Sequence, residues 1–300
     1  MVTKETSINR QGSITQVFRW LKLVPIVPII LLLPFILWGA FGEVLCPHDP
    51  YLIDLTVALK PPAWLPGGDW TYFLGTDQLG RDLFSRVIAG ARSSLLVAVF
   101  GVFCSGFIGV LLGIISGFLG GKVDNVIMRI TDTWMSIPPM FFLLVLVAIS
   151  RESGIQGLAP IIIAISVTMW VPFARIVRAE TLSIKQQEYI ALARVTGCSN
   201  LRIMIKDIWP GVLNTIVVMA TMQLGGTIMA ESGLSFLGVG VQPPQTAWGL
   251  LISESSTYMS IAWWIPTFAG FAITITILGA NLFGDWLRDT LDPITRQTMK

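Results

Sequence analysis

Six long stretches without a single charged residue dominate this 300-residue chain. A helix needs about 20 mostly apolar residues to cross the hydrocarbon core of a bilayer, and stretches of this length meet that requirement. They span residues 23–42, 93–121, 133–150, 153–174, 208–230 and 255–284. The chain is therefore predicted to be an all-α, polytopic membrane protein with about six transmembrane helices.

A seventh uncharged stretch, residues 232–253, differs in character, since it reads SGLSFLGVGVQPPQTAWGLLIS. Its Gly, Pro and Gln residues disfavour an unbroken lipid-facing helix, because lipid offers no partner for freed backbone groups. We expect a loop or re-entrant segment packed against protein. The first apolar stretch is expected to stay as a kinked span rather than act as a cleaved signal peptide, because its core exceeds the usual ~7 to 15 residues.

Lys and Arg are distributed unequally between the connecting segments. With six spans and the N-terminus inside, the inner segments carry 15 of the 20 basic residues and the outer segments carry 5. Basic residues close to spans favour the cytoplasmic side. Both termini are therefore predicted to be cytoplasmic, with residues 1–22 and 286–300 as the inner ends. Residues 46–92 become a periplasmic loop that contains a short helix around residues 81–88.

Composition excludes several classes of function. The net charge of +2 gives no bulk attraction for nucleic acid. Three cysteines without a close pair and a single histidine, His48, predict neither a disulfide framework nor a multi-ligand metal site. The only Gly-Lys pair, Gly121–Lys122, is not followed by Ser or Thr as in a Walker A loop. We expect no catalytic residue, metal or bound cofactor, so that a partner would have to supply energy for transport.

Residues 175–210 contain the largest inner cluster of basic residues. They are predicted to form a helix, a turn at Gly197 and a second short helix capped by Ser199. The pattern also fits a DNA-binding helix-turn-helix, but the segment is pinned between two spans. It is either a docking surface or an amphipathic connector at the lipid headgroups. The expected docking residues are Glu188, Tyr189, Ala191, Ala193, Arg194 and Gly197.

The second span places small residues at every fourth position, a pattern that lets another helix backbone pack closely. They are Gly101, Ser105, Gly109, Gly113, Gly117 and Gly121, with Gly109, Gly113 and Gly117 at the centre of the stripe. The pattern leaves open whether the partner helix belongs to this chain or to another.

The fifth span aligns Gln223, Thr227 and Glu231 on one helix face at intervals of four residues. Polar groups in a span are costly unless they face protein or water. Two interpretations follow. These side chains line a translocation path, or they hydrogen-bond to neighbouring helices while Glu231 reaches the outer interface.

Five motifs, in order along nearly the whole chain, resemble the C-type permease subunits of bacterial ABC importers for dipeptides, oligopeptides and nickel. They are LGTDQLGRDLFSRVIAGARSSL (74–95), GGKVDNVIMRITD (120–132), EYIALARVTGCSNLRIMIKDIWP (188–210), AESGLSFLGVGVQPPQTAWG (230–249) and NLFGDWLRDTLDP (281–293). The resemblance implies the type I importer permease fold in the bacterial inner membrane. Its parts would be a first transmembrane helix at residues 23–45 and a five-helix core at residues 93–285 that includes the hairpin.

In that family the cytoplasmic hairpin carries an EAA motif that sits in a cleft on an ATPase subunit and transmits its closure. Gly197 and Pro210 match the motif's Gly and Pro. Ala191 stands in place of its Glu and Leu192 in place of its first Ala, and the nearest carboxylate is Glu188. The resemblance therefore implies docking of this helix without the motif's own carboxylate.

The resemblance also implies partners. These are a second permease subunit in a heterodimer, two ATPase subunits that carry ATP and Mg, and a periplasmic or lipid-anchored substrate-binding protein. The chain is predicted to form half of a translocation pathway for peptides, with nickel chelates or other small solutes as the alternative cargo. A stand-alone channel or ion-coupled secondary transporter is the competing class, and the absence of charge in the span cores disfavours it.

Overall fold

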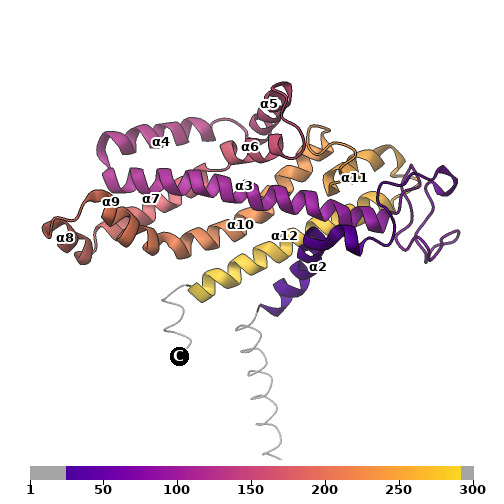
Figure 1. The fold of residues 1–300 in the computed structure, drawn as a ribbon, viewed down its shortest axis with the longest axis horizontal. Helices are drawn as coiled ribbons and strands as arrows, with labels where there is room; N and C mark the ends of the chain where they lie inside the picture. The colour runs from indigo at the N-terminus through magenta and orange to yellow at the C-terminus, as the bar shows by residue number, and fades with distance from the viewer. Residues whose placement is uncertain (1–24, 292–300) are drawn as a thin grey trace, which may run out of the picture.

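The computed structural model describes residues 25–291, which fold into helices joined by loops, with no β-strand in that range (Figure 1). The expected inner segment 1–22 and residues 292–300 of the expected tail lie outside the described residues. The helices are α2 (Ile26–Leu45), α3 (Leu83–Leu119), α4 (Gly121–Met135), α5 (Pro139–Glu152), α6 (Ala159–Thr168), α7 (Val171–Lys185), α8 (Glu188–Val195), α9 (Asn200–Ile203), α10 (Trp209–Phe236), α11 (Trp248–Ser255) and α12 (Trp264–Leu291). Short 3-10 turns at Leu55–Val57 and Ser256–Tyr258 and a π turn at Met204–Ile208 complete the set.

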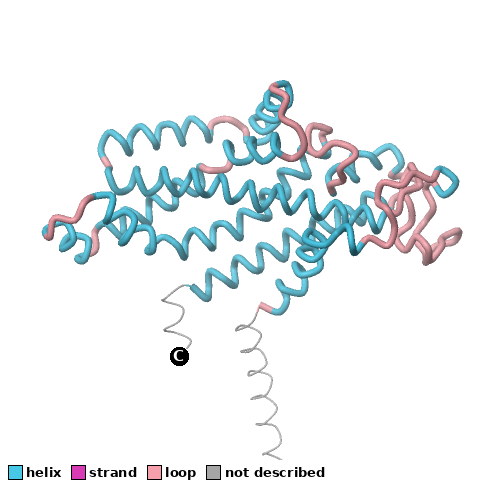
Figure 2. The backbone as a smooth tube through the Cα atoms, viewed as in Figure 1, coloured by secondary structure: helices cyan, strands magenta, loops and turns pink. Residues whose placement is uncertain are grey.

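The long helices lie along the long axis of the molecule. Helix α3 contacts α2, α6, α7 and α10, and α12 packs on α10 and α2. The α8–α9 hairpin lies at one end, the hairpin end, and the loop before α3 lies at the other, the loop end (Figures 1 and 2). Helix α3 therefore runs between the hairpin end and the loop end.

Within residues 25–291, three helices are long and apolar enough to cross a membrane: α3, the continuous helix Asn200–Phe236 that includes α10, and α12. Two bent pairs, α4 with α5 and α6 with α7, raise the number of spans within residues 25–291 to as many as five. The apolar part of α2, Ile26–Gly42, is shorter than these. The apolar segments thus follow the predicted order, but several of them are not the single straight helices that were expected.

Proline explains both bends. The expected span 133–150 is in fact part of the α4–α5 pair, which bends by 93°. Pro138 is held in an extended conformation by the following Pro139 and interrupts the helix there. The α6–α7 pair bends by 41° because Pro172, in the first turn of α7, has no N–H to continue the α6 hydrogen-bond ladder.

The short separate helix expected around residues 81–88 is wrong, because these residues lead directly into α3. Asp82 caps α3, and its side chain accepts a hydrogen bond from the Ser85 N–H at 3.0 Å. Arg86 lies in the first turns of α3, and its side chain is 2% exposed. Its charge is neutralised by ion pairs, so it does not end the helix.

The glycine stripe packs against α7 of the same chain. A Cβ atom added to Gly109, Gly113 or Gly117 would lie 2.3, 2.7 or 2.9 Å from a backbone oxygen at the start of α7 or within it. The two helix backbones are therefore in direct contact, as small residues at every fourth position permit. Gly121 is not part of this contact, because it starts α4 with a φ of +56° and no neighbour within 4 Å of an added Cβ.

The uncharged segment 232–253 is packed against protein. Helix α10 continues to Phe236, and after a turn the chain forms α11, which contacts α10 and α12. Trp248 is completely buried and donates its indole N–H to the Val87 carbonyl of α3 at 2.9 Å. No part of this segment forms an unbroken span.

Candidate functional site

The turn of the hairpin is a closed C-terminal helix cap. After α8, the Gly197 N–H donates to the Arg194 carbonyl and the Cys198 N–H donates to the Ala193 carbonyl, both at 3.0 Å. This pair of bonds is the Schellman arrangement, which requires a left-handed residue at its centre. Gly197 has a φ of +82°, and nothing lies within 4 Å of an added Cβ. Its role is therefore conformational rather than steric.

Three isoleucines anchor the hairpin to the helix bundle. Ile190 of α8, Ile203 of α9 and Ile208 of the π turn are all completely buried. They belong to one apolar cluster with Phe118 of α3 and Ile184 of α7. The hairpin is thus fixed to the ends of α3 and α7, which is more than an amphipathic connector at the headgroups requires.

The outward face of α8 contains most of the predicted docking residues. Glu188, Tyr189, Ala191, Arg194 and Gly197 are exposed. Ala193 is half-buried because it packs against the apolar cluster that holds the isoleucines. Five of the six residues are therefore exposed in the isolated chain and accessible to a partner.

Leu192 and Val195 were not identified from the sequence as docking residues. Their exposed fractions are 64% and 86%, on the same helix whose Ile190 is completely buried. An apolar pair three residues apart, on the face opposite a buried isoleucine, is the pattern that would have indicated them. The tip of the hairpin thus presents apolar surface as well as charge.

Several basic residues near the hairpin hold the structure together. The Arg194 guanidinium and the Lys185 ammonium lie 5.4 and 5.8 Å from the centre of the Phe118 ring, within the range of cation–π attraction. Arg178 of α7 forms two bonds with the Asp124 carboxylate of α4, at 2.5 and 2.6 Å. Part of the basic cluster that the sequence shows here therefore serves packing.

The polar face of α10 points mostly into the subunit. Glu231 is completely buried and accepts hydrogen bonds from the Ser94 hydroxyl at 2.8 Å and the Ser235 hydroxyl at 2.7 Å. Thr227 is also completely buried. The expectation that Glu231 reaches the outer interface is wrong, because its side chain is buried. Its bond with Ser94 of α3, and the 3.7 Å contact between the Thr227 hydroxyl and the Met169 sulfur, match the second interpretation, helix-to-helix bonding. Gln223 is half-buried, and its place on a pathway stays a prediction.

A buried cluster of two arginines and two carboxylates joins three parts of the loop end. Arg81 contacts Asp77 at 2.7 Å and Glu254 at 2.9 Å, and Arg86 contacts the same two carboxylates at 2.6 and 2.9 Å. The outer loop, α3 and the end of α11 are therefore connected by paired charges. Asp77, Arg81 and Arg86 belong to the motif at residues 74–95, whose sequence alone indicates no role for them.

His48 lies beside the cap of α3, with Nδ1 at 3.3 Å from the Asp82 carboxylate. Between residues 25 and 291, no group of three or more His, Cys, Asp or Glu side chains is placed to hold a metal ion. This histidine thus contacts the cap of α3 and the ring of Tyr72 in the outer loop.

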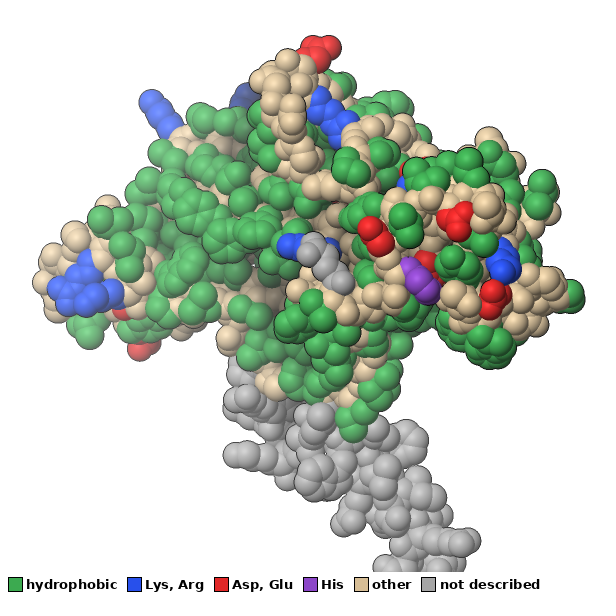
Figure 3. Space-filling model, turned by 45° about the vertical axis from the view of Figure 1, so that its right-hand side comes forward, with side chains coloured by type: hydrophobic (Ala, Val, Ile, Leu, Met, Phe, Trp, Pro, Cys, Tyr) green, Lys and Arg blue, Asp and Glu red, His purple; other side chains and the backbone are tan. Residues whose placement is uncertain are grey.

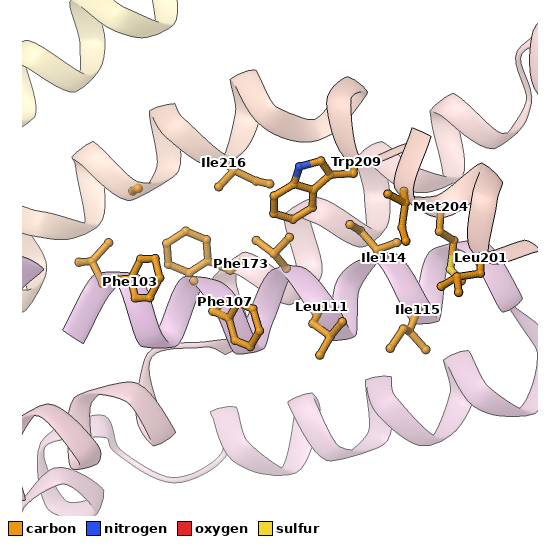
Figure 4. Close-up of a pocket in the computed structure, with 15 residues that line it drawn as sticks. Phe103, Phe107, Leu111, Ile114, Ile115, Phe173, Leu201, Met204, Trp209 and Ile216 are labelled. Atoms are coloured by element: carbon orange, nitrogen blue, oxygen red, sulfur yellow. The ribbon is translucent and has the colours of Figure 1, made fainter. Parts of the chain in front are cut away.

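An apolar groove of about 560 Å³ runs between α3 and the α9–α10 segment. Figure 4 shows its walls, with Phe103 and Phe107 from α3 and Leu201 and Trp209 from α9 and α10. Figure 3 shows hydrophobic side chains over much of the visible face, with charged side chains more frequent toward the loop end and at the hairpin. Such a surface suits contact with lipid or with another apolar chain.

Comparison with known proteins identifies the family. Residues 109–297, which include the centre of the glycine stripe, the hairpin and α10–α12, match the model described as "Binding-protein-dependent transport system inner membrane component". The chain belongs to this family. It is an inner-membrane permease component of a transport system, as the sequence motifs predicted.

Curated relatives are similar over most of the permease. The Di/tripeptide transport system permease protein DppC of Pseudomonas aeruginosa (strain UCBPP-PA14) is 35% identical over 88% of this chain and 86% of its own length. The Oligopeptide transport system permease protein OppC of Haemophilus influenzae is 42% identical over 75% of this chain and 71% of its own. The Glutathione transport system permease protein GsiD of Escherichia coli O6:K15:H31 is 42% identical over 76% and 74%.

A solved structure shares the fold of the permease. A chain of the MetNI methionine ABC transporter, solved in inward-facing conformations, superposes with a TM-score of 0.58 at 19% sequence identity. The match covers 70% of this chain and 98% of the other. The predicted all-α, type I importer permease fold is therefore confirmed.

Proposed function

We propose that this permease forms half of the translocation pathway for peptides in an ATP-driven importer. Its partners would be a second permease subunit in a heterodimer, two ATPase subunits that bind ATP and Mg, and a substrate-binding protein at the outer face. Relatives 35–42% identical to this chain are named as dipeptide, oligopeptide and glutathione permeases, which supports a peptide cargo. The excess of Lys and Arg supports a cytoplasmic hairpin end and cytoplasmic termini.

The exposed tip of the anchored hairpin carries this proposal. Leu192 and Val195 are apolar side chains exposed on a helix that lies beyond the spans. Apolar residues held outward on a fixed element are typical of a contact with another protein. An ATPase subunit that covers Leu192 and Val195 would gain apolar contact. Such contact does not require the motif's Glu, which Ala191 replaces in this chain.

The contacts of the hairpin suggest how it would transmit motion. When ATP binding closes the two ATPases, α8 would move with the subunit on which it is docked. Ile190 would pass that motion to Phe118 of α3 and Ile184 of α7, with which it shares an apolar cluster. Because packed side chains are not compressible, the displacement would reach the spans and reorient the pathway.

Substitution of the tip tests the docking surface. In the assembled importer, Leu192→Asp combined with Val195→Asp should remove most ATPase subunits that co-purify with a tagged permease, because each change places a charge in an apolar contact. Leu55→Asp is the matched control, since Leu55 is 67% exposed at the loop end and should leave ATPase recovery unchanged. Full recovery of ATPase with the double variant would contradict the proposed coupling surface.

Cargo and energy source need a separate experiment. The complete importer in proteoliposomes should accumulate a labelled tripeptide only when ATP is present on the ATPase side and the binding protein on the other. Uptake of a nickel chelate in place of the peptide would refute the peptide assignment. Peptide uptake by the permease alone, without ATP, would refute the importer.

A further inference from the structure

A polar hollow of about 450 Å³ lies between the α5–α6 loop and the α10–α11 loop. Four polar side chains line it, together with Ile155 and the Pro243–Pro244 pair, and we call it the polar cup. Those side chains are Arg151, Gln156, Gln242 and Gln245. Two loops that are about 90 residues apart in the sequence thus converge on one arginine.

Hydrogen bonds hold the two loops of the cup in place. The Arg151 guanidinium donates to the Gly240 carbonyl, which links the end of α5 to the α10–α11 loop. Gln242 donates through its side-chain amide to the Gly238 carbonyl at 2.8 Å. The Val241 N–H donates to the Ser235 hydroxyl at 3.0 Å, which fastens the loop to α10. The cup therefore has a defined shape before any ligand arrives.

The charge in the cup has one sign. Arg151 is the only charged residue that lines it, and within residues 25–291 one of its five N–H groups is engaged, by Gly240. Gln156 and Gln245 make no side-chain hydrogen bond inside that range, and both are exposed to the cup. An amide side chain offers donors and an acceptor together, which is the complement of a peptide group.

The position of the cup argues against contact with lipid. A guanidinium and three amides would be costly against hydrocarbon, so this side of the subunit faces water or protein. Helix α5 projects on the side of the bundle opposite α2 (Figure 1). Gln156, Gln242 and Gln245 are exposed in the subunit, so solute can reach the cup.

We propose that the polar cup receives the carboxyl-terminal end of a peptide cargo. Arg151 pairs with the terminal carboxylate through its remaining N–H groups, and the amides of Gln156 and Gln245 bind the adjacent peptide groups. No acidic side chain lines the cup, so the amino terminus of the cargo makes no ion pair there. This inference rests on the proposed function, because it names the chemical group of the cargo that the permease recognises.

A comparison of three peptides tests the cup in the complete importer. We would measure initial uptake of a tripeptide with a free carboxylate, its carboxyl-terminal amide and its N-acetyl form, with the same binding protein throughout. Arg151→Gln should lower the ratio of free-acid to amide uptake by roughly tenfold, the size of one charge-assisted hydrogen bond. The ratio of free-acid to N-acetyl uptake should not change. Since the binding protein is identical in every arm, a change in a ratio belongs to the permease.

Two further variants separate recognition from folding. Arg151→Lys keeps the charge and should retain most of the discrimination, whereas Gln245→Ala removes a side chain without a hydrogen bond in the described range and should weaken uptake of the acid. Lys122→Gln is the control, because it removes the same charge from an exposed position at the hairpin end of the helices. It should leave all ratios unchanged.

The outcomes distinguish the cup from the importer. If the unmodified importer transports the peptide but Arg151→Gln leaves the acid-to-amide ratio unchanged, the cup inference fails and the proposed function stands. An equal slowing of all three peptides would also overturn it, and would assign the cup to contact with the binding protein. Absence of peptide uptake by the unmodified importer would overturn both.

Discussion

Replacement of Gly109 by alanine tests how closely α3 packs on α7. The new Cβ would lie 2.3 Å from the Trp170 carbonyl oxygen and 2.5 Å from the Phe173 Cβ, where ordinary contacts begin at 3.4 Å. The helices must separate by about 1 Å to accept it, and two more close contacts of the stripe would loosen with them. Overpacking of this kind costs about 1–3 kcal/mol, and the shared contacts favour the upper end. The gain in helix propensity from Gly to Ala is about 1 kcal/mol, so the net loss should be about 2 kcal/mol.

Gly106→Ala is the matched control on the same helix. Its Cβ would lie 3.5 Å from the Phe173 ring, an ordinary contact, so only the gain in propensity of about 1 kcal/mol should be seen. The two variants should therefore differ by about 3 kcal/mol. At about 2 °C per kcal/mol for a protein of this size, their melting temperatures in detergent micelles should differ by about 6 °C.

The measurement is thermal unfolding followed by circular dichroism, with the purified permease variants in one detergent. If Gly109→Ala melts at or above the temperature of Gly106→Ala, the backbone contact between α3 and α7 is not tight. The assignment of the stripe to packing inside this chain would then be refuted, and a contact with another subunit would be the better explanation.

Arg86→Gln should destabilise the permease by about 3 kcal/mol, because it leaves the buried carboxylates without one of their partners. Lys60→Gln, which breaks a more exposed ion pair with Asp69, should cost less than about 1 kcal/mol. Equal melting temperatures of the two variants would contradict this. Ser94→Ala should cost about 1–3 kcal/mol by removing a donor from buried Glu231, and an unchanged unfolding midpoint would show that the carboxylate finds another partner. The Thr71 N–H, the Lys60 ammonium and the Thr71 hydroxyl lower the pKa of Asp69 from 3.8 to about 2. Because the folded-state pKa lies below the unfolded value, this stabilisation should persist above pH 3.8 and disappear as the pH falls toward 2; NMR titration of this carboxylate with a midpoint near 3.8 would contradict the loop geometry.

The sequence located the apolar segments because uncharged length is a property of the chain alone. It missed that α3 already begins at Leu83, because Arg92 was taken as the boundary of the span that starts at residue 93. The ion pairs of Arg86 with Asp77 and Glu254, which stabilise this first part of α3, form only in the tertiary structure. It also expected one straight span at residues 133–150, where Pro138 and Pro139 turn the chain. At the start of α3, ion pairs with distant residues overrode the local pattern of charge. At residues 133–150, the backbone restriction at two prolines overrode the pattern of apolar residues.

The same limit applies to the candidate site. Gly197 was identified correctly as the helix stop, because a left-handed glycine after a helix is a local signal. Thr227 and Glu231 were aligned correctly on one helix face, but which neighbour that face meets depends on how α10 packs on α3. The exposure of Val195 likewise follows from the burial of Ile190 on the other side of α8.

Helix α3 is 37 residues long, which at 1.5 Å per residue makes it about 55 Å, against about 30 Å for the hydrocarbon core. It has no proline and no break between Leu83 and Leu119. One end sits under the hairpin through Phe118, and the other is clamped to the outer loop and α11 through Arg86. Such an unbroken helix would move as a rigid rod. A tilt of 10° about one end would displace the other end by ~10 Å. A small rotation imposed at one membrane face would thus become a large displacement at the other.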